Sequence, residues 1–373
     1  MSPFNNKVKT FFALLRAGLW EKSISLAPYV PVDYESLFQL AKEQSVIGLI
    51  AAGFEQVNDM ELSEDDVVPF MHKVLHQESR NEAMDAFVAK IIALLKDAGI
   101  RAVLVKGQGI AQCYARPRWR ACGDIDILLE GQDYERAKDL LVPRATSVDE
   151  EDLESKHLGL TIDTWIVELH GLLHGHISRR ADSLVEEVQE DMFLRGGVRV
   201  WDNEGVEVEL PSPDNDAVFI FSHILQHFFR GGIGVRQICD WCRLLWTYRE
   251  SIDRGLLASR ICKMGMMSEW KAFAAFAVDY LSMPVDAMPF YNSSTLWSFK
   301  ARRIASYILQ VGNFGHNRDN TIYEKYPYLI AKAISFSRHC YDFFCHFIIF
   351  PLDSSRVFWR MLNVGIGAVA EGR

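Results

Sequence analysis

Residues 123–128 of the chain are Gly-Asp-Ile-Asp-Ile-Leu, an alternation of acidic and apolar side chains that is typical of a β-strand. Because successive side chains of a strand point to opposite faces, we expect Asp124 and Asp126 on one face and Ile125 and Ile127 in a core on the other. Two neighbouring carboxylates repel each other unless a cation lies between them, and Mg²⁺ prefers carboxylate oxygens. The pair is therefore a candidate metal site for phosphate chemistry. The alternative is a pair of acids on an exposed strand face.

The segment upstream of this strand predicts a phosphate-binding turn. A strand-like apolar run over 102–105 is followed by Lys106-Gly107-Gln108-Gly109 and by a predicted helix through Tyr114. Backbone N–H groups at a helix N-terminus favour a phosphate, and glycine lets the backbone approach it closely. Lys106 could neutralise phosphate charge. The alternative is a strand-to-helix turn in which the glycines serve only its tightness.

A third acid lies further along the chain. Two strand-like runs cover 158–162 and 165–170, and the second contains Glu168 on the same face as His170. A charged residue in such an apolar strand needs a partner or a metal. We therefore predict that Glu168 supplies a third carboxylate, unless it lies on an exposed edge strand. His170 is predicted to contact substrate or to orient this acid.

Hydrophobic periodicity divides the chain into three regions. Residues 1–98 have helical spacing, 99–210 alternate short strands with helices, and 211–373 are again helical. A chain of 373 residues is long for one simple core. The predicted fold class is therefore α+β, with a small mixed-sheet core flanked by N- and C-terminal helical regions.

The composition excludes disordered, collagen-like and fibrous proteins. Apolar residues make up 49% and charged residues 24%, as in a globular chain. The formal net charge of −9 makes a long nucleic acid an unlikely partner, although a local basic cleft is compatible with it. Seven irregularly spaced cysteines predict a reducing compartment. No apolar run is long enough for a transmembrane segment, so we expect a cytoplasmic location.

Taken in order, these motifs resemble the DNA polymerase β-like nucleotidyltransferase superfamily. Within it they are most similar to a bacterial family of uncharacterised nucleotidyltransferases typified by K-G, a spaced arginine, D-I-D-L-L and V-E-L-H. The matching residues here are Lys106-Gly107, Arg120, the strand over 124–128, and Val167-Glu168-Leu169-His170. The likeness extends to residues 232–241 and, less specifically, to 312–315.

The resemblance implies a polymerase β-like core and a reaction. The reaction is Mg²⁺-dependent transfer of a nucleoside monophosphate from an NTP, such as ATP, to a hydroxyl-type acceptor with release of pyrophosphate. In that superfamily three acids bind two metal ions; here they are Asp124, Asp126 and Glu168, and Mn²⁺ is the alternative ion. The residues implied in nucleotide binding are Lys106, Gly107, Gln108 and Arg120. The expected acceptor is a small molecule or a protein.

Acceptor-site candidates are His170, Arg236 and Asp240, although the i, i+4 spacing of Arg236 and Asp240 is also explained by a structural ion pair. His223 and His227 have the same spacing and are interpreted as core or acceptor-site histidines.

One departure from the superfamily keeps alternatives open. Gln108 stands where the turn usually has serine or glycine, so a hydroxyl contact to phosphate is missing and Lys106 or Arg120 would substitute. The first alternative is a phosphotransferase that moves the γ-phosphate with the same acids. The second is a nucleotide- or partner-binding protein that has kept the fold and lost catalysis.

Overall fold

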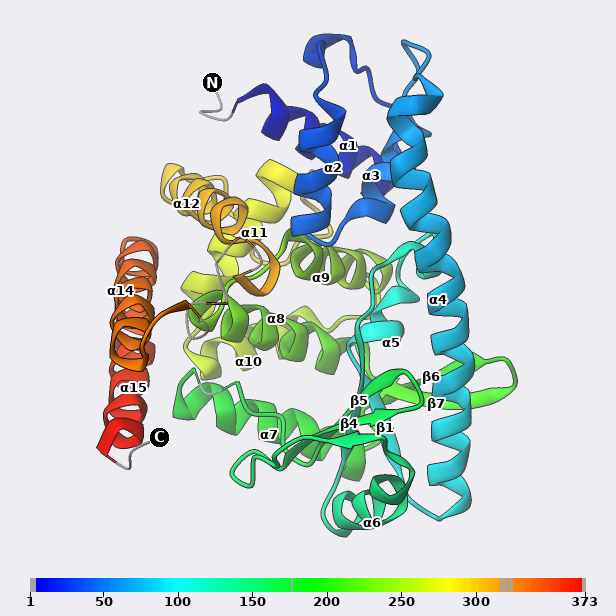
Figure 1. Cartoon of the computed structure of the whole chain (residues 1–373), viewed down its shortest axis with the longest axis vertical. Coiled ribbons are helices and arrows are strands. Elements are labelled where there is room, and N and C mark those ends of the chain that lie inside the picture. The colour runs from blue at the N-terminus through cyan, green and yellow to red at the C-terminus, as the bar shows by residue number, and fades with distance from the viewer. Residues whose placement is uncertain (1–4, 176, 316, 318–320, 322–324, 371–373) are drawn as a thin grey trace.

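The computed structural model describes residues 5–175, 177–315, 317, 321 and 325–370 (Figure 1). Helices precede the sheet region in the sequence, as predicted. They are α1 (Asn6–Trp20), α2 (Tyr34–Glu43), α3 (Ile47–Phe54) and the long α4 (Glu64–Asp97). Among the described residues, short 3-10 turns also occur at Ala27–Tyr29, Pro117–Trp119, Val142–Arg144 and Asn313–Gly315.

The central region contains a sheet of seven described strands. The strands are β1 (Ala102–Val105), β2 (Asp124–Leu129), β3 (Ser147–Val148), β4 (His157–Ile162), β5 (Trp165–His170), β6 (Val198–Asn203) and β7 (Val206–Pro211). The helices between them are α5 (Gly107–Ala111), α6 (Gln132–Leu141) and α7 (Arg179–Leu194). Sequence analysis predicts four of these strands and misses β3, β6 and β7. The predicted helix after the glycine turn is also shorter than expected, because it ends at Ala111 and not at Tyr114.

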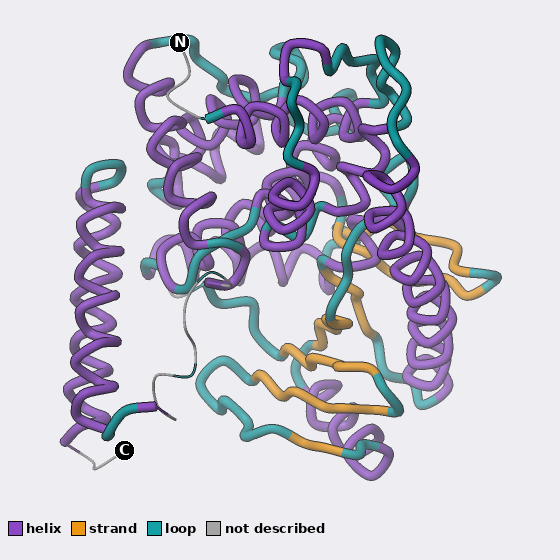
Figure 2. The backbone as a smooth tube through the Cα atoms, turned by 45° about the horizontal axis from the view of Figure 1, so that its top comes forward, coloured by secondary structure: helices purple, strands orange, loops and turns teal. Residues whose placement is uncertain are grey.

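The sheet is mixed, which confirms the predicted α+β class. Its strand order is β3-β4-β5-β2-β1-β7-β6. Strand β2 pairs antiparallel with β1 and parallel with β5, and β1 pairs parallel with β7. The acidic strand β2 therefore lies near the middle of the sheet, and Figure 2 shows the strands grouped on one side of a mostly helical molecule.

The two faces of the sheet are covered differently. Ile125 and Ile127 of β2 are buried, as predicted, in a core that includes the C-terminal half of α4 and helix α6. The opposite face contributes Val103, Val105 and Leu128 to a second core shared with the helices. One face of the sheet thus serves packing alone, and the acidic face is turned toward the C-terminal helices.

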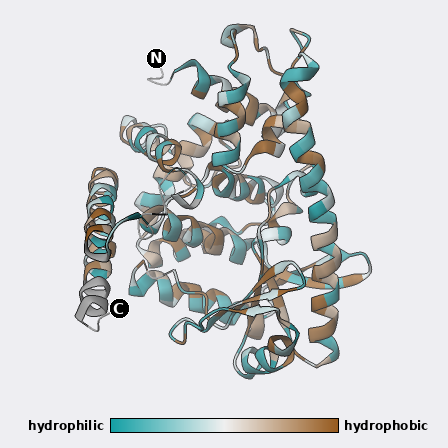
Figure 3. Cartoon of the chain, viewed as in Figure 1, coloured by the Kyte–Doolittle hydropathy of each residue, from teal (hydrophilic) through white to brown (hydrophobic). Residues whose placement is uncertain are grey.

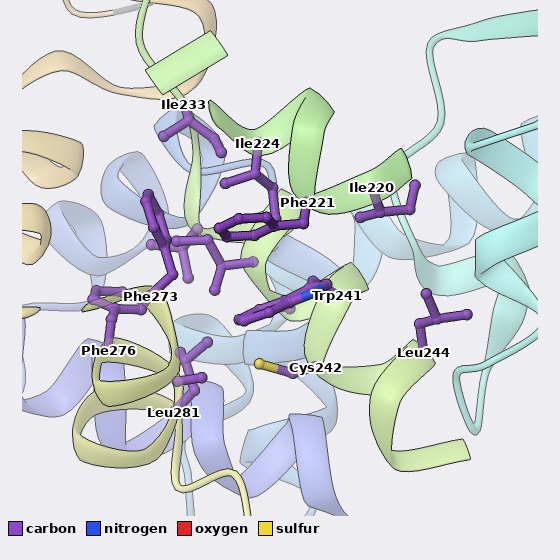
Figure 4. Packing of buried hydrophobic residues seen from close by; sticks show 14 of the residues in the cluster. Ile220, Phe221, Ile224, Ile233, Trp241, Cys242, Leu244, Phe273, Phe276 and Leu281 are labelled. Carbon is purple, nitrogen blue, oxygen red and sulfur yellow. The ribbon is translucent and has the colours of Figure 1, made fainter. Parts of the chain in front are cut away.

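The C-terminal helices are α8 (Pro213–Arg230), α9 (Val235–Thr247), α10 (Arg254–Met264), α11 (Met267–Leu281), α12 (Thr295–Val311), α14 (Tyr328–Phe347) and α15 (Pro351–Ala370). Trp241 of α9 is fully buried and stacks on Phe221 of α8, with ring centroids 5.4 Å apart (Figure 4). Its ring also lies against Trp270 of α11. This packing fixes α8 and α9 relative to each other. Helix α8 contacts β7, and α9 contacts α5, the short helix that follows β1.

Figure 3 shows hydrophilic and hydrophobic residues mixed along the helices, and the buried apolar ones form the two cores described above. None of the described helices has the length and apolar character needed to cross a membrane.

Candidate active site

The strand register brings the predicted acids together. Because β2 and β5 are parallel neighbours, Asp126 lies opposite Glu168, and Asp124 lies opposite Ile166. Paired residues of adjacent strands share a face, so Asp124, Asp126 and Glu168 project from the same side of the sheet. Asp126 is 2% exposed, which is rare for an aspartate without compensating partners.

Lys106 supplies one of these partners. Val105, the last residue of β1, pairs with Asp126, and Lys106 follows it with a positive φ of 59°. Its Nζ lies 2.6 Å from Oδ1 of Asp126. Burial alone would lower the pKa of Lys106, but the carboxylates of Asp126, Glu168 and Asp124 together outweigh burial, and the pKa lies above its ordinary value. The lysine therefore remains a cation beside the acids.

His170 supplies the second partner. Its Nε2 lies 2.9 Å from Oδ1 of Asp126 and 3.5 Å from Oε2 of Glu168. Burial would lower the pKa of His170, yet its hydrogen bonds to the two carboxylates raise the pKa above its ordinary value. His170 thus lies within reach of both acids, and its role in orienting Glu168 stays a prediction.

Sequence analysis missed His157, which belongs to the same group. Nε2 of His157 lies 3.3 Å from Oε2 of Glu168, and its ring centroid lies 4.8 Å from that of His170. Strands β4 and β5 form a hairpin with a two-residue turn at Asp163 and Thr164, and its register pairs His157 with His170. That turn length, read in the sequence, was the signal for this pairing.

The pKa values of the acids differ because their neighbours differ. Burial, together with the charge of Asp126, raises the pKa of Asp124. Hydrogen bonds from His157 and His170 instead hold the pKa of Glu168 well below its ordinary range. The positive charges of Lys106 and Arg236 do not outweigh burial and Asp126 at Asp124, so a cation beside it would be stabilising.

In the glycine turn, Gly107 borders the cavity, whereas the side chain of Gln108 points away from it toward α4. Gly107 has a φ of +38° and lines the cavity described below. The Gln108 side chain does not line that cavity; its Nε2 donates to Oδ1 of Asp85 on α4 at 2.7 Å. Helix α5 has only five residues, so its dipole is weak. Positive charge at this turn therefore comes from Lys106.

Arg120 and Asp240 form a buried bidentate ion pair. Nε of Arg120 lies 2.7 Å from Oδ1 of Asp240, and Nη2 lies 2.8 Å from Oδ2. The hydroxyl of Tyr114 donates to Oδ1 of Asp240 at 2.7 Å. The expected Arg236–Asp240 pair is present but longer, at 3.8 Å. Asp240 is thus a structural partner of Arg120, and both residues form part of the cavity wall.

A cavity of about 570 Å³ lies between the acidic face of the sheet and helices α8 and α9. On the sheet side, the residues that line the cavity include Lys106, Gly107, Asp124, Asp126, His157, Glu168 and His170. The helix-side residues are His223, His227, Arg236 and Gln237. Every predicted site residue except Gln108 therefore lines this one cavity.

The helix-side wall has polar atoms with unused hydrogen-bonding capacity. Nε of Arg236 and Oε1 of Gln237 are buried and have no hydrogen-bond partner among the described residues. Burial and the nearby Lys106 lower the pKa of His223 well below its ordinary value, and burial lowers the pKa of His227 to about 4. Both imidazoles are therefore neutral near pH 7.

Comparison with known proteins finds a sequence family that matches most of the chain. Residues 31–281, well over half of the chain, match the model of a family described as uncharacterised nucleotidyltransferase. The match includes both walls of the cavity. A crystal structure of an antigenic nucleotidyltransferase-like protein from Paracoccidioides brasiliensis is similar to 56% of this chain and 96% of its own, with 13% identity and a TM-score of 0.33. No curated protein matches the sequence.

Proposed function

The chain belongs to this family of uncharacterised nucleotidyltransferases, and on that premise we propose that its cavity transfers a nucleoside monophosphate from an NTP to a hydroxyl-type acceptor, releasing pyrophosphate. One observation carries the proposal. Asp124, Asp126 and Glu168 share one face of two adjacent strands and border a cavity large enough for a small ligand.

The chemistry of the donor set, which is three carboxylates, fits a divalent cation of the hard, oxygen-preferring kind. In the described structure the ligand oxygens of Asp124, Asp126 and Glu168 do not all lie within 4.8 Å of one another, so the fit rests on donor chemistry and shared cavity face. Three carboxylates face one cavity, and the raised pKa of Asp124 reflects burial beside another acid without enough positive charge. We assign Asp124, Asp126 and Glu168 as ligands of Mg²⁺, with Mn²⁺ as the alternative. A bound cation would neutralise charge on the triphosphate and on the departing pyrophosphate.

Lys106 is assigned to the nucleotide phosphates. Its Nζ already lies among the acids, 2.6 Å from Oδ1 of Asp126, where its ammonium group takes the place of a metal cation. With a cation held by Asp126, Lys106 could exchange that carboxylate for a phosphate oxygen. Gly107 presents backbone to the same space. Gln108 is assigned an indirect role, because its side chain anchors the turn to α4.

Arg120 is assigned to the cavity wall. Both of its donors toward Asp240 are used, and Nη1 lies 3.3 Å from the Ala121 carbonyl oxygen. Phosphate binding by Arg120 would require the breaking of a buried ion pair, which is costly. Arg236 is better placed for an anionic group, since its Nε lacks a partner among the described residues.

The acceptor is assigned to the wall formed by α8 and α9. Neutral His223 and His227, and Arg236, offer hydrogen bonds to a polar molecule. Oε1 of Gln237, which has no hydrogen-bond partner among the described residues, can accept another. A small molecule or a short protein segment suits a cavity of about 570 Å³. The net charge of −9 disfavours a long nucleic acid.

The reaction type is tested with two labels. The full chain is incubated with Mg²⁺, cell extract and NTP labelled either at the α- or at the γ-phosphate. Nucleotidyl transfer attaches the α-label to an acceptor and releases the γ-label as pyrophosphate. Transfer of the γ-label to the acceptor would identify a phosphotransferase instead. Transfer of neither label, with no binding of NTP, would leave a protein that has lost catalysis.

A further inference from the structure

Two histidines and a glutamate converge on one side of the cavity. Register pairs His157 of β4 with His170 of β5, and Glu168 lies two residues before His170 on the same face. Each of the three side chains offers one possible ligand atom, a ring nitrogen or a carboxylate oxygen. These three atoms all lie within 4.8 Å of one another. No other group of three or more such residues meets this criterion in the part of the chain that the structure describes.

The separations suit a shared metal ion. Oε2 of Glu168 lies 3.3 Å from Nε2 of His157 and 3.5 Å from Nε2 of His170. Ligands about 2.1 Å from a tetrahedral zinc ion are about 3.4 Å from one another. A charge-assisted N–H···O bond is usually shorter, at about 2.7–2.9 Å. We propose that His157, Glu168 and His170 bind a nitrogen-preferring divalent metal ion, Zn²⁺ above all.

The chemistry of the ligands separates this site from the carboxylate site. Imidazole nitrogen suits Zn²⁺ and neighbouring transition metals, whereas Mg²⁺ requires oxygen ligands. His157 lies outside the acidic motifs of the sequence, and its ring comes from a different strand. The two sites share only Glu168, whose carboxylate has a second oxygen for the other ion.

Three protein ligands leave a tetrahedral ion with an open position. All three residues line the cavity, so the open position is accessible from it. A zinc ion with three protein ligands and one exchangeable ligand is the arrangement of catalytic rather than structural zinc sites. The exchangeable ligand would be water or an oxygen of a molecule in the cavity.

Metal binding changes one existing contact. Nε2 of His170 also lies 2.9 Å from Oδ1 of Asp126, and one nitrogen cannot both donate to a carboxylate and bind a metal ion. Asp126 would then keep the contact with Lys106 at 2.6 Å. The buried carboxylate therefore remains paired when the ion binds.

The test measures metal binding and not activity. The full chain, treated with a chelator, is titrated with ZnCl₂ by calorimetry, in parallel with His157→Ala and His170→Ala. We expect one saturable site in the unaltered chain and a loss of at least about 100-fold in Zn²⁺ affinity in each variant. Excess Mg²⁺ should not displace the bound Zn²⁺, because Mg²⁺ does not take imidazole nitrogen as a ligand. Co²⁺ bound in place of Zn²⁺ should give the visible absorption of a tetrahedral site.

His174→Ala is the matched control. His174 lines the same cavity but lies 2.6 Å from Glu186, outside the group of three, so Zn²⁺ affinity should be unchanged. Circular dichroism of the metal-free variants excludes misfolding as the cause of any loss. Equal Zn²⁺ affinity in all variants, or no saturable binding, would overturn the inference. The zinc proposal rests on the geometry of three side chains and not on nucleotidyl transfer. Tight Zn²⁺ binding without label transfer would therefore refute the proposed function and leave the zinc site standing.

Discussion

Nζ of Lys106 lies 2.6 Å from Oδ1 of Asp126, so the turn after β1 is tied to the acidic centre of the sheet. Both side chains are largely buried, with exposed fractions of 16% and 2%. An ion pair in such a place stabilises the fold only while both partners are present.

We expect Lys106→Met to lower the free energy of unfolding by roughly 1–3 kcal/mol, because Asp126 then keeps a buried charge with only His170 as partner. The double variant Lys106→Met with Asp126→Asn should lose less than the sum of the single changes. Urea unfolding of the four proteins measures this coupling. Lys90→Met, at an exposed pair with Asp163, serves as the control. Strict additivity would contradict the pairing.

The Arg120–Asp240 pair predicts a larger effect on stability. Arg120→Ala leaves Asp240 buried with Tyr114 and a distant Arg236, and should cost about 3–5 kcal/mol in urea unfolding. Arg116→Ala is the matched control, because its pair with Glu55 is substantially exposed and should be worth about 1 kcal/mol or less. If the two variants were equally stable, Arg120 would not be the wall residue that we assign.

The pH dependence of stability is predicted from Glu269 of α11. Burial and the charge of the neighbouring Asp353 raise the pKa of Glu269 to about 8, against an ordinary value of 4.5. Between these values the folded chain keeps a proton that the unfolded chain has released. The contribution of Glu269 to stability is therefore full below pH 4.5 and is lost as pH rises through about 8.

Glu269→Gln should flatten this part of the pH profile of urea unfolding, because glutamine has no proton to release. Glu250→Gln is the control, since the side chain of Glu250 is 89% exposed. An identical slope for the Glu269 variant and the unaltered chain would contradict the assignment.

Glycines allow α1 and α3 to approach closely. A Cβ atom on Gly18 would overlap the carbonyl oxygen of Leu49, and one on Gly53 would overlap that of Leu14. Gly18→Ala and Gly53→Ala should each destabilise the chain by about 2 kcal/mol or more, since backbone must move to admit the methyl group. Gly231→Ala, where no heavy atom lies within 4 Å of the added Cβ, should change thermal unfolding little. An unchanged midpoint in the first two would contradict the packing.

Local pattern was sufficient to predict the acidic strand and its two faces. Alternation placed Asp126 opposite the core, and Ile125 and Ile127 are buried as expected. The position beside Asp126 depends on the register of two strands that are far apart in the sequence. Glu168, the predicted third acid, occupies that position. The metal-binding roles of these acids stay predictions.

Long-range pairing explains what the sequence did not predict. His157 begins a strand that sequence analysis starts one residue later, so its pairing with His170 across the hairpin was missed. Arg120 and Asp240 are 120 residues apart, and no local pattern links them. Gln108 has the spacing of a phosphate-binding residue, but tertiary contact with Asp85 directs its side chain to α4.

The central claim is that Asp124 and Asp126 are required for nucleotidyl transfer. It is tested most directly by measuring transfer of α-labelled NTP to an acceptor in extract, with Mg²⁺, by the unaltered chain and by the Asp124→Asn, Asp126→Asn double variant. Glu130→Gln, directly after the same strand and outside the cavity lining, is the control. We predict transfer by the unaltered chain and the control, and none by the folded double variant. Equal transfer by all three would contradict the account.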